Sequence, residues 1–262
     1  PDSAYATVAG LYETGNVGGY VRNLHHWSGN LLVIIIFLHL LRVFFTGALD
    51  RKRRINWLLG LCLFILVLFS NFTGYLLPWD QLAFWAVTIF TNMMSYIPVI
   101  GEHLAILIRG GPEVGAATLR LFFGLHIGIL PLITVLLLIL HFWLVRKAGG
   151  LIQHREEHHN RVPVNPNLIA REMATAAGLL ALLCLFAALV DAPLADPANP
   201  ALSPNPAKAA WYFMGLQELL LHLHPAVSIC VIPLLVVFAL AAVPYINGNV
   251  LPGGRWLGGE QG

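Results

Sequence analysis

Four histidines stand as two pairs in long apolar stretches of the chain: His25 with His39, fourteen residues apart, and His126 with His141, fifteen apart. At about 100° and 1.5 Å per helical residue, each pair projects from about one helix face, with its members ~21 Å apart along the axis. Two such helices facing each other would offer two bis-histidine sites, one near each face of a bilayer. Because ionisable groups at that depth are costly and usually functional, the pattern predicts four metal ligands that hold two haem irons.

Two glycines in the apolar stretch between these pairs support the haem interpretation. Gly60 and Gly74 are also fourteen residues apart, and a missing side chain lets a flat macrocycle approach a helix backbone closely. Two other interpretations stay open at this point. The glycines could serve helix packing, and each histidine could form a hydrogen bond between neighbouring helices in lipid.

Three arginines stand close to the histidines, at the ends of the apolar stretches. Each lies three to five residues from one of the ligands: Arg22, Arg42 and Arg146. A guanidinium in that position could pair with a haem propionate. It could also simply extend its charged head to the polar interface of the membrane.

The composition indicates an integral membrane protein. Hydrophobic residues make up 58% of the 262 residues and charged residues 11%, against roughly 25% charged in a typical soluble domain. The three cysteines occur singly, without the paired spacing that an iron-sulfur cluster or a covalently attached haem requires. A cofactor of either kind is therefore not expected.

Five segments are long and apolar enough to span a bilayer. They are residues 24–46, 56–77, 121–145, 170–190 and 226–246. Between the second and third, the connection 78–120 is too polar to span, but Gln81 to Met94 is aromatic and amphipathic and predicts a helix in the membrane interface. The Pro- and Asn-rich stretch 191–206 predicts a loop. The fold class expected is an all-α membrane bundle with a haem-binding core of the four-helix type.

The basic residues of the connections predict an orientation. Eleven of the 15 lysines and arginines fall on one side if the first span runs inward, and four on the other. The positive-inside rule then puts the connections 47–55 and 146–170 in the cytoplasm or its equivalent. His25 and His126 would lie near the outer face, and His39 and His141 near the inner one.

Several motifs together resemble cytochrome b of the bc and b6f complexes. The motifs are residues 22–29 with 39–42, Gly74-Tyr75-Leu76-Leu77-Pro78-Trp79-Asp80-Gln81, 97–101, and Leu125-His126 with His141-Phe142. The fifteen-residue second spacing resembles the b6f type. The resemblance implies a b6-like part at 1–150, an inner-side loop at 151–168 and a part at 169–262 that resembles subunit IV of the b6f type. The family's first helix has no counterpart, and Pro1 falls in the outer loop expected after it.

The resemblance also implies a ligand set. In the family, two helices each supply one histidine to each haem, so His25 with His126 would hold the outer haem b and His39 with His141 the inner one. The protein would set the haem potentials through ligand hydrogen bonds, burial and the partners of the propionates.

An outer quinol site is a further implication of the resemblance. In the family it is built from the loop after the third helix and a Pro-Glu-Trp-Tyr motif, which here is Ala209-Ala210-Trp211-Tyr212. Ala210 replaces the glutamate that takes a quinol proton. We expect Glu218 to substitute for it, since it follows Trp211 by seven residues and returns to nearly the same helix face. His222 and His224 are other candidates, and all three could instead be interfacial polar residues.

The function expected is electron transfer across a membrane between quinol or quinone and partner redox proteins, within a quinol:cytochrome c-type oxidoreductase. The family's partners are a Rieske iron-sulfur protein and a c-type cytochrome. Membrane lipids and an oligomeric, dimeric assembly are also expected, in a bacterial inner membrane or another energy-transducing membrane; no nucleic-acid partner is expected.

Two rival functions stay open. The first is a quinone-reactive dihaem anchor for multihaem or iron-sulfur subunits of a Rieske-less respiratory complex, favoured by Ala210. The second is a non-redox transporter whose histidines relay protons. A reduced-minus-oxidised spectrum separates the transporter from the haem proteins, and the co-purifying subunits separate the two haem proteins.

Overall fold

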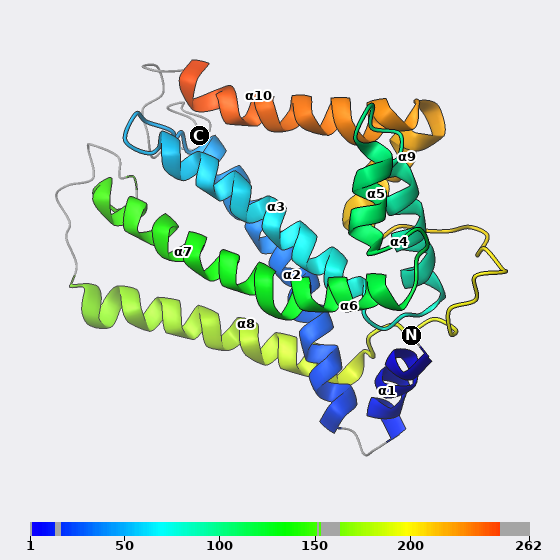
Figure 1. Ribbon diagram of the computed structural model, residues 1–262. Helices are drawn as coiled ribbons and strands as arrows, with labels where there is room; N and C mark the ends of the chain where they lie inside the picture. The colour runs from blue at the N-terminus through cyan, green and yellow to red at the C-terminus, as the bar shows by residue number, and fades with distance from the viewer. Residues whose placement is uncertain (1, 14–16, 151, 153–162, 247–262) are drawn as a thin grey trace. The chain divides into compact units, whose positions relative to one another are not determined.

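The computed structural model describes residues 2–13, 17–150, 152 and 163–246 (Figure 1). Within these ranges the chain forms helices and no β-strand. The helices are α1 Asp2–Glu13, α2 Val17–Phe45, α3 Arg54–Leu76, α4 Gln81–Met94, α5 Gly101–Arg109, α6 Ala116–Gly124, η1 Leu125–Ile129, α7 Leu130–Lys147, η3 Val164–Leu168, α8 Ile169–Leu189, η4 Trp211–Phe213, α9 Met214–His222, η5 Val227–Val231 and α10 Ile232–Ile246. Most of the predicted inner-side loop 151–168 lies outside the described residues, and the three-part division of the chain stays a prediction.

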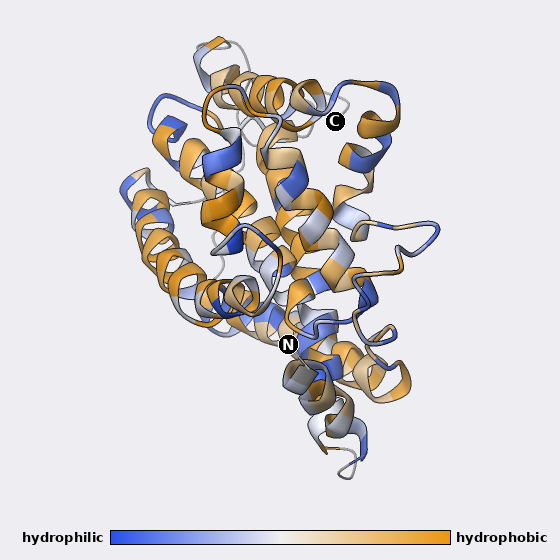
Figure 2. Ribbon diagram, turned by 45° about the vertical axis from the view of Figure 1, so that its right-hand side comes forward, coloured by the Kyte–Doolittle hydropathy of each residue, from blue (hydrophilic) through white to orange (hydrophobic). Residues whose placement is uncertain are grey.

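Five of these helical runs are long and apolar enough to cross a membrane. They are Val17–Phe45, Arg54–Leu76, Ala116–Lys147, Val164–Leu189 and Val227–Ile246. The ribbon of these runs is mostly hydrophobic, and the hydrophilic residues gather in the connections (Figure 2). A helix satisfies its own backbone hydrogen bonds, which is what a lipid environment demands. The prediction of an all-α integral membrane protein with five spans is confirmed.

The first span is longer than the sequence predicts. It begins at Val17 instead of residue 24 and has 29 residues, or about 43 Å at 1.5 Å per residue. The hydrocarbon core of a bilayer is only about 30 Å thick, so the ends of α2 extend into the headgroup region. The polar residues at its start therefore remain helical without entering hydrocarbon.

Prolines reshape two of the spans. The π-helical turn η1 ends two residues before Pro131, and η5 ends two residues before Pro233. Proline has no N–H to donate and its ring crowds the preceding turn, so the helix widens there to a five-residue hydrogen-bond spacing. His126 lies inside η1, so the widened turn sets the direction of a predicted haem ligand.

A short helix at the beginning of the chain was not predicted. Residues Asp2–Glu13 form α1, where the sequence analysis expected only an outer loop. The interfacial helix expected at Gln81 to Met94 is present as α4, with the same bounds. The helical continuation expected after Trp211 is present as η4 and α9.

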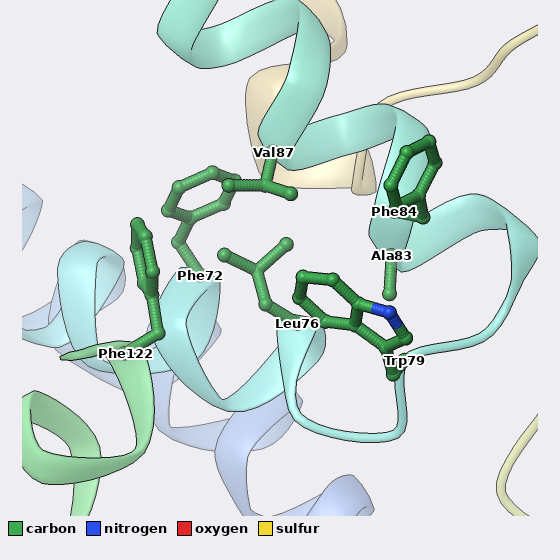
Figure 3. Packing of buried hydrophobic residues seen from close by; sticks show 7 residues of the cluster. All are labelled: Phe72, Leu76, Trp79, Ala83, Phe84, Val87 and Phe122. Atoms are coloured by element: carbon green, nitrogen blue, oxygen red, sulfur yellow. The ribbon is translucent and has the colours of Figure 1, made fainter. Parts of the chain in front are cut away.

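The described residues divide into two compact units. Unit 1 comprises the described residues within 1–10, 61–139 and 194–242, and unit 2 those within 11–60, 140–193 and 243–262. In unit 1, a buried aromatic cluster joins α3, α4 and α6 (Figure 3). It contains Phe72, Leu76, Trp79, Ala83, Phe84, Val87 and Phe122.

A tight turn between α3 and α4 places this cluster. Trp79 is buried and has φ +52°, a backbone region that is costly for a side chain of this size. The buried Asp80 then caps α4, because its Oδ1 accepts from the Ala83 N–H at 2.8 Å. Burying the Trp79 ring against Phe84, with centroids 5.9 Å apart, offsets the strain and holds the turn.

In unit 2, α2 packs along α8. Near its start, the buried Asn23 donates to the Ala187 carbonyl at 3.1 Å and to the Asp191 carboxylate at 2.9 Å. Trp27 donates to the Val190 carbonyl at 2.9 Å. The end of α8 has carbonyls with no helical partner, and these side chains supply donors to them.

Candidate haem sites and an apolar cavity

His39 and His141 line one cavity of about 290 Å³ in unit 2. His39 comes from α2 and His141 from α7, and Gly60 on α3 lines the same cavity. The two imidazole ring centres lie 6.5 Å apart and their planes make an angle of 72°. The structure thus brings together one histidine from each of the two sequence pairs.

This separation fits two imidazoles that share one metal. Two imidazole nitrogens that bound a metal from opposite sides, each at about 2.0 Å, would put the ring centres about 6 to 6.5 Å apart. The Nδ1 atom of His141 is buried and has no hydrogen-bond partner among the described residues. A methyl group added to Gly60 would meet His141 Cε1 at 3.8 Å, an ordinary contact distance. The cavity residues therefore fit a flat, bis-histidine-ligated haem.

Arginines line the same cavity, although not all of those predicted. Arg42 and Arg53 both contribute to its wall. Arg53 is held by the Asp50 carboxylate at 2.5 Å and by the carbonyls of Ala148 and Gly150 at 3.3 and 3.1 Å. Arg146 is exposed on the last turn of α7 and is not part of the wall.

Arg53 was not predicted as a residue of this cavity from the sequence. The residue stands in a run of four basic residues at 51–54, which the sequence analysis used only for the charge count. Asn56 was also missed: it lines the cavity, and its Oδ1 atom is buried with no hydrogen-bond partner within the described part of the chain. Its position one turn before Gly60 on α3 is the signal that could have indicated it.

His126 is held against α3 in unit 1. Its Nδ1 lies 3.0 Å from the Ser70 carbonyl and 3.1 Å from Thr73 Oγ1. A carbonyl can only accept, so Nδ1 carries the proton and the lone pair lies on Nε2. That tautomer leaves Nε2 as the atom that can bind a metal, with the second ring nitrogen fixed by a hydrogen bond to the backbone.

Gly74 explains how His126 can approach α3 so closely. A Cβ added at Gly74 would lie 2.6 Å from His126 Cε1 and 3.1 Å from its Nε2. Real Cβ atoms essentially never come so close to a neighbour. The missing side chain at Gly74 thus makes room first of all for the imidazole.

His25 is an exposed residue of α2 in unit 2, and His126 belongs to unit 1. Their pairing stays a prediction. Arg22, three residues before His25, donates to the carbonyls of Ala192 and Pro193, each at 2.8 Å, and to the Tyr12 hydroxyl. These contacts fasten the start of α2 to the loop after α8.

Unit 1 holds a second, mostly apolar cavity of about 240 Å³. Its walls come from α3, α4, the loop before η4, α9, and the start of the last span. Aromatic and sulfur-containing side chains dominate the wall: Phe69, Phe72, Tyr75, Trp85, Phe90, Met93, Met94 and Phe213. Its polar side chains include Tyr75, Lys208 and Gln217.

The residues predicted to be catalytic at the quinol site, Trp211, Tyr212 and Glu218, do not line this cavity. Ala210 does line it. Trp211 is 49% exposed. Tyr212 is partly buried, and burial together with the neighbouring Tyr75 raises the pKa of its phenol. The Glu218 side chain is 70% exposed and pairs with the equally exposed His222 at 3.4 Å. Gln217, one residue earlier on α9, faces the cavity instead.

Comparison with known families identifies the class of protein. The family model described as Cytochrome b(N-terminal)/b6/petB matches residues 30–206. Similar proteins include cytochrome b6 of Heliobacterium mobile, 42% identical over 149 residues, which are 57% of this chain and 70% of the relative. Cytochrome b6 of Porphyra purpurea is 39% identical over 146 residues, 56% of this chain and 68% of the relative.

A solved structure is similar over nearly the whole chain. A chain of a hyperthermophilic respiratory complex III superposes with a TM-score of 0.81 at 23% sequence identity. The match covers 97% of this chain and 69% of that chain. At this identity the likeness shows that the fold is shared.

Proposed function

The chain belongs to the cytochrome b family, and from this premise we propose that it carries electrons across an energy-transducing membrane through two haem b groups. Each haem is held by two histidines, His39 with His141 at the inner site and His25 with His126 at the outer one. Bound between two imidazoles, such a haem gains and loses one electron and has no open position for a small molecule. The observation that carries the proposal is the 6.5 Å separation of the His39 and His141 rings in one cavity.

The chain's own residues prepare the two sites differently. At His126, the Ser70 carbonyl fixes the tautomer and Gly74 gives space to the ring. At the inner site, Arg42 and Arg53 provide positive charge for the propionates, which a planar guanidinium binds through paired hydrogen bonds. Arg22 and Arg146 stay proposed partners of propionates at the span ends.

We propose that the second cavity binds the ring of a quinol or quinone. Its aromatic wall suits a flat apolar ring, and a few polar groups suffice to orient the ring oxygens. Tyr75 and Lys208 are those groups. A quinol must also lose its protons when it is oxidised, and the cavity wall carries no carboxylate among the described residues.

Glu218 remains our proposed proton acceptor. Because its carboxylate lies 70% exposed beside His222 and outside the cavity wall, it takes the proton through water and not from the ring oxygen directly. Trp211 and Tyr212 belong to the turn η4 that leads into α9, and in this proposal they position the start of that helix.

In this proposal the chain works with other redox subunits, a Rieske protein and a c-type cytochrome, in an oligomeric quinol:cytochrome c-type oxidoreductase. The absence of a carboxylate from the described cavity wall favours one alternative, a quinone-reactive dihaem anchor of a Rieske-less complex. Identification of the subunits that co-purify with the chain separates the two.

A spectrum tests the proposal directly. The purified protein is expected to show a reduced-minus-oxidised spectrum of low-spin haem b, two haems per chain by pyridine haemochrome, and reduction of haem on addition of a quinol. A protein without haem in that preparation would instead support a proton-relaying transporter.

A further inference from the structure

One wall of the apolar cavity is an irregular loop with no secondary structure of its own. The loop connects α8 to η4, and its residues Pro204 and 207–210 line the cavity. We call residues 199–210 the wall loop. An irregular segment must find partners for its backbone N–H and C=O groups, and in a membrane protein water cannot always supply them.

Gln81, the first residue of α4, forms hydrogen bonds to the beginning of the wall loop. Its side-chain Oε1 accepts from the Asn199 N–H at 2.6 Å, and its Nε2 donates to the Leu202 carbonyl. Its backbone N–H donates to the Asp196 carbonyl at 2.8 Å. Trp85, one turn further along α4, donates to the same Leu202 carbonyl at 3.1 Å.

Gln217 on α9 forms hydrogen bonds of the same kind to the end of the wall loop. Its Oε1 accepts from the Ala209 N–H at 2.8 Å, and its Nε2 donates to the Ala207 carbonyl at 2.6 Å. Gln217 itself lines the cavity. Two glutamines from different helices thus bind the two ends of one loop with the same pair of hydrogen bonds.

The chemistry of glutamine explains this arrangement. A side-chain amide has one carbonyl acceptor and an NH₂ donor, the same pair of functions as a peptide group. It can therefore take the place of a neighbouring strand for a loop that has none. Pro204 and Pro206 lie between the two hydrogen-bonded ends of the loop, and proline has no backbone N–H that needs a hydrogen-bond acceptor.

We propose that Gln81 and Gln217 are positioning residues that hold the wall loop at the distance from α3 and α4 that a bound quinol ring requires. This inference rests on the proposed quinol site. The two glutamines act through the loop backbone: they set the position of Pro204 and Ala207 to Ala210, and these residues close the cavity around the ring.

Hydrogen-deuterium exchange of the intact complex tests, without any quinol, whether the hydrogen bonds from Gln81 and Gln217 hold the wall loop. Gln217→Leu removes two hydrogen bonds, so exchange at the Ala209 amide should rise about ten- to thirtyfold, while the Asn199 amide keeps its wild-type rate. Gln81→Leu should give the reverse pattern. A matched control is Leu221→Met, on the exposed face of α9, which should change neither amide.

Quinol kinetics test the positioning. In each glutamine variant the KM for quinol in haem reduction should rise about tenfold, with kcat, haem content and haem potentials unchanged. Gln217→Glu retains the acceptor for the Ala209 N–H and should recover part of the loss relative to Gln217→Leu. A purely structural defect would lower haem content or kcat in addition to raising KM.

The outcomes separate this inference from the proposed function. If exchange at both amides stays at the wild-type rate in the leucine variants, Gln81 and Gln217 do not hold the wall loop and the inference is wrong. If exchange rises but KM does not, the loop is held but does not position the quinol. A photoreactive quinone that fails to label residues 204–217 of the wild-type complex would instead overturn the quinol site itself, whatever the exchange rates show.

Discussion

Gly74→Ala is expected to remove the outer haem by displacing one of its ligands. The new methyl group would lie 2.6 Å from His126 Cε1, which is 0.8 Å short of the 3.4 Å at which contacts become ordinary. The imidazole must move away from α3 by about that amount. Its distances to the Ser70 carbonyl and Thr73 Oγ1, now 3.0 and 3.1 Å, would grow to about 3.8 Å and no longer be hydrogen bonds.

The cost follows from these two changes. Overpacking costs about 1–3 kcal/mol, and loss of the hydrogen bond that fixes a metal-ligating histidine weakens metal binding by about 10- to 100-fold. Haem content by pyridine haemochrome, with a redox titration to identify which haem remains, measures the effect. Gly60→Ala is the matched control, because its methyl group would lie 3.8 Å from His141 Cε1 and leave that ring in place.

The reasoning would be refuted if Gly74→Ala retained two haems per chain with wild-type spectra. It would also be refuted if Gly60→Ala displaced its histidine while Gly74→Ala did not. Loss of the inner haem in Gly60→Ala with the fold intact has a different meaning: it would show that the macrocycle itself occupies the space beside Gly60.

Three further predictions concern the inner arginine, the proton acceptor and the orientation. Arg53→Gln removes a positive charge from the inner cavity wall and should lower the midpoint potential of one haem by an amount on the order of tens of millivolts. The control Lys52→Gln, at an exposed position outside that wall, should leave this potential unchanged, and equal shifts in the two variants would contradict the role of Arg53. Glu218→Gln should slow quinol-driven haem reduction and change its pH dependence, and unaltered kinetics at every pH would exclude Glu218 as the proton acceptor. In a background without the native cysteines, an impermeant thiol reagent should label a cysteine at Ala195 from outside and one at Gln153 only from inside, and the opposite accessibility would invert the predicted topology.

The spans and the common depth of His39 and His141 could be predicted, because they depend on composition, loop charges and helical periodicity; the pairing of the two residues as ligands is what the resemblance to cytochrome b implies and stays a prediction. His39 and His141 come from different helices, yet their spacings from His25 and His126 were enough to expect them at one depth. The bounds of α4 were predictable for the same reason, since Gln81 to Met94 is a short amphipathic stretch between turn residues.

What could not be predicted depends on the rotation of helices and on packing. Glu218 on α9 and Trp211 in η4 are both exposed, and neither lines the cavity. Gln217, about 100° around the helix, faces it instead. Similarly, nothing in the run 51–54 indicates that the Arg53 side chain turns inward, and the π-helical turn around His126 arises from the demands of Pro131 within a packed span.

The central claim is that two histidines far apart in the sequence ligate the same haem. The most direct test compares His39→Leu with His141→Leu by redox titration of the purified complex. Each variant is expected to retain one haem b per chain, and both variants are expected to retain the same haem, with the same midpoint potential and spectrum. Loss of different haems in the two variants, or two haems in either, would contradict it.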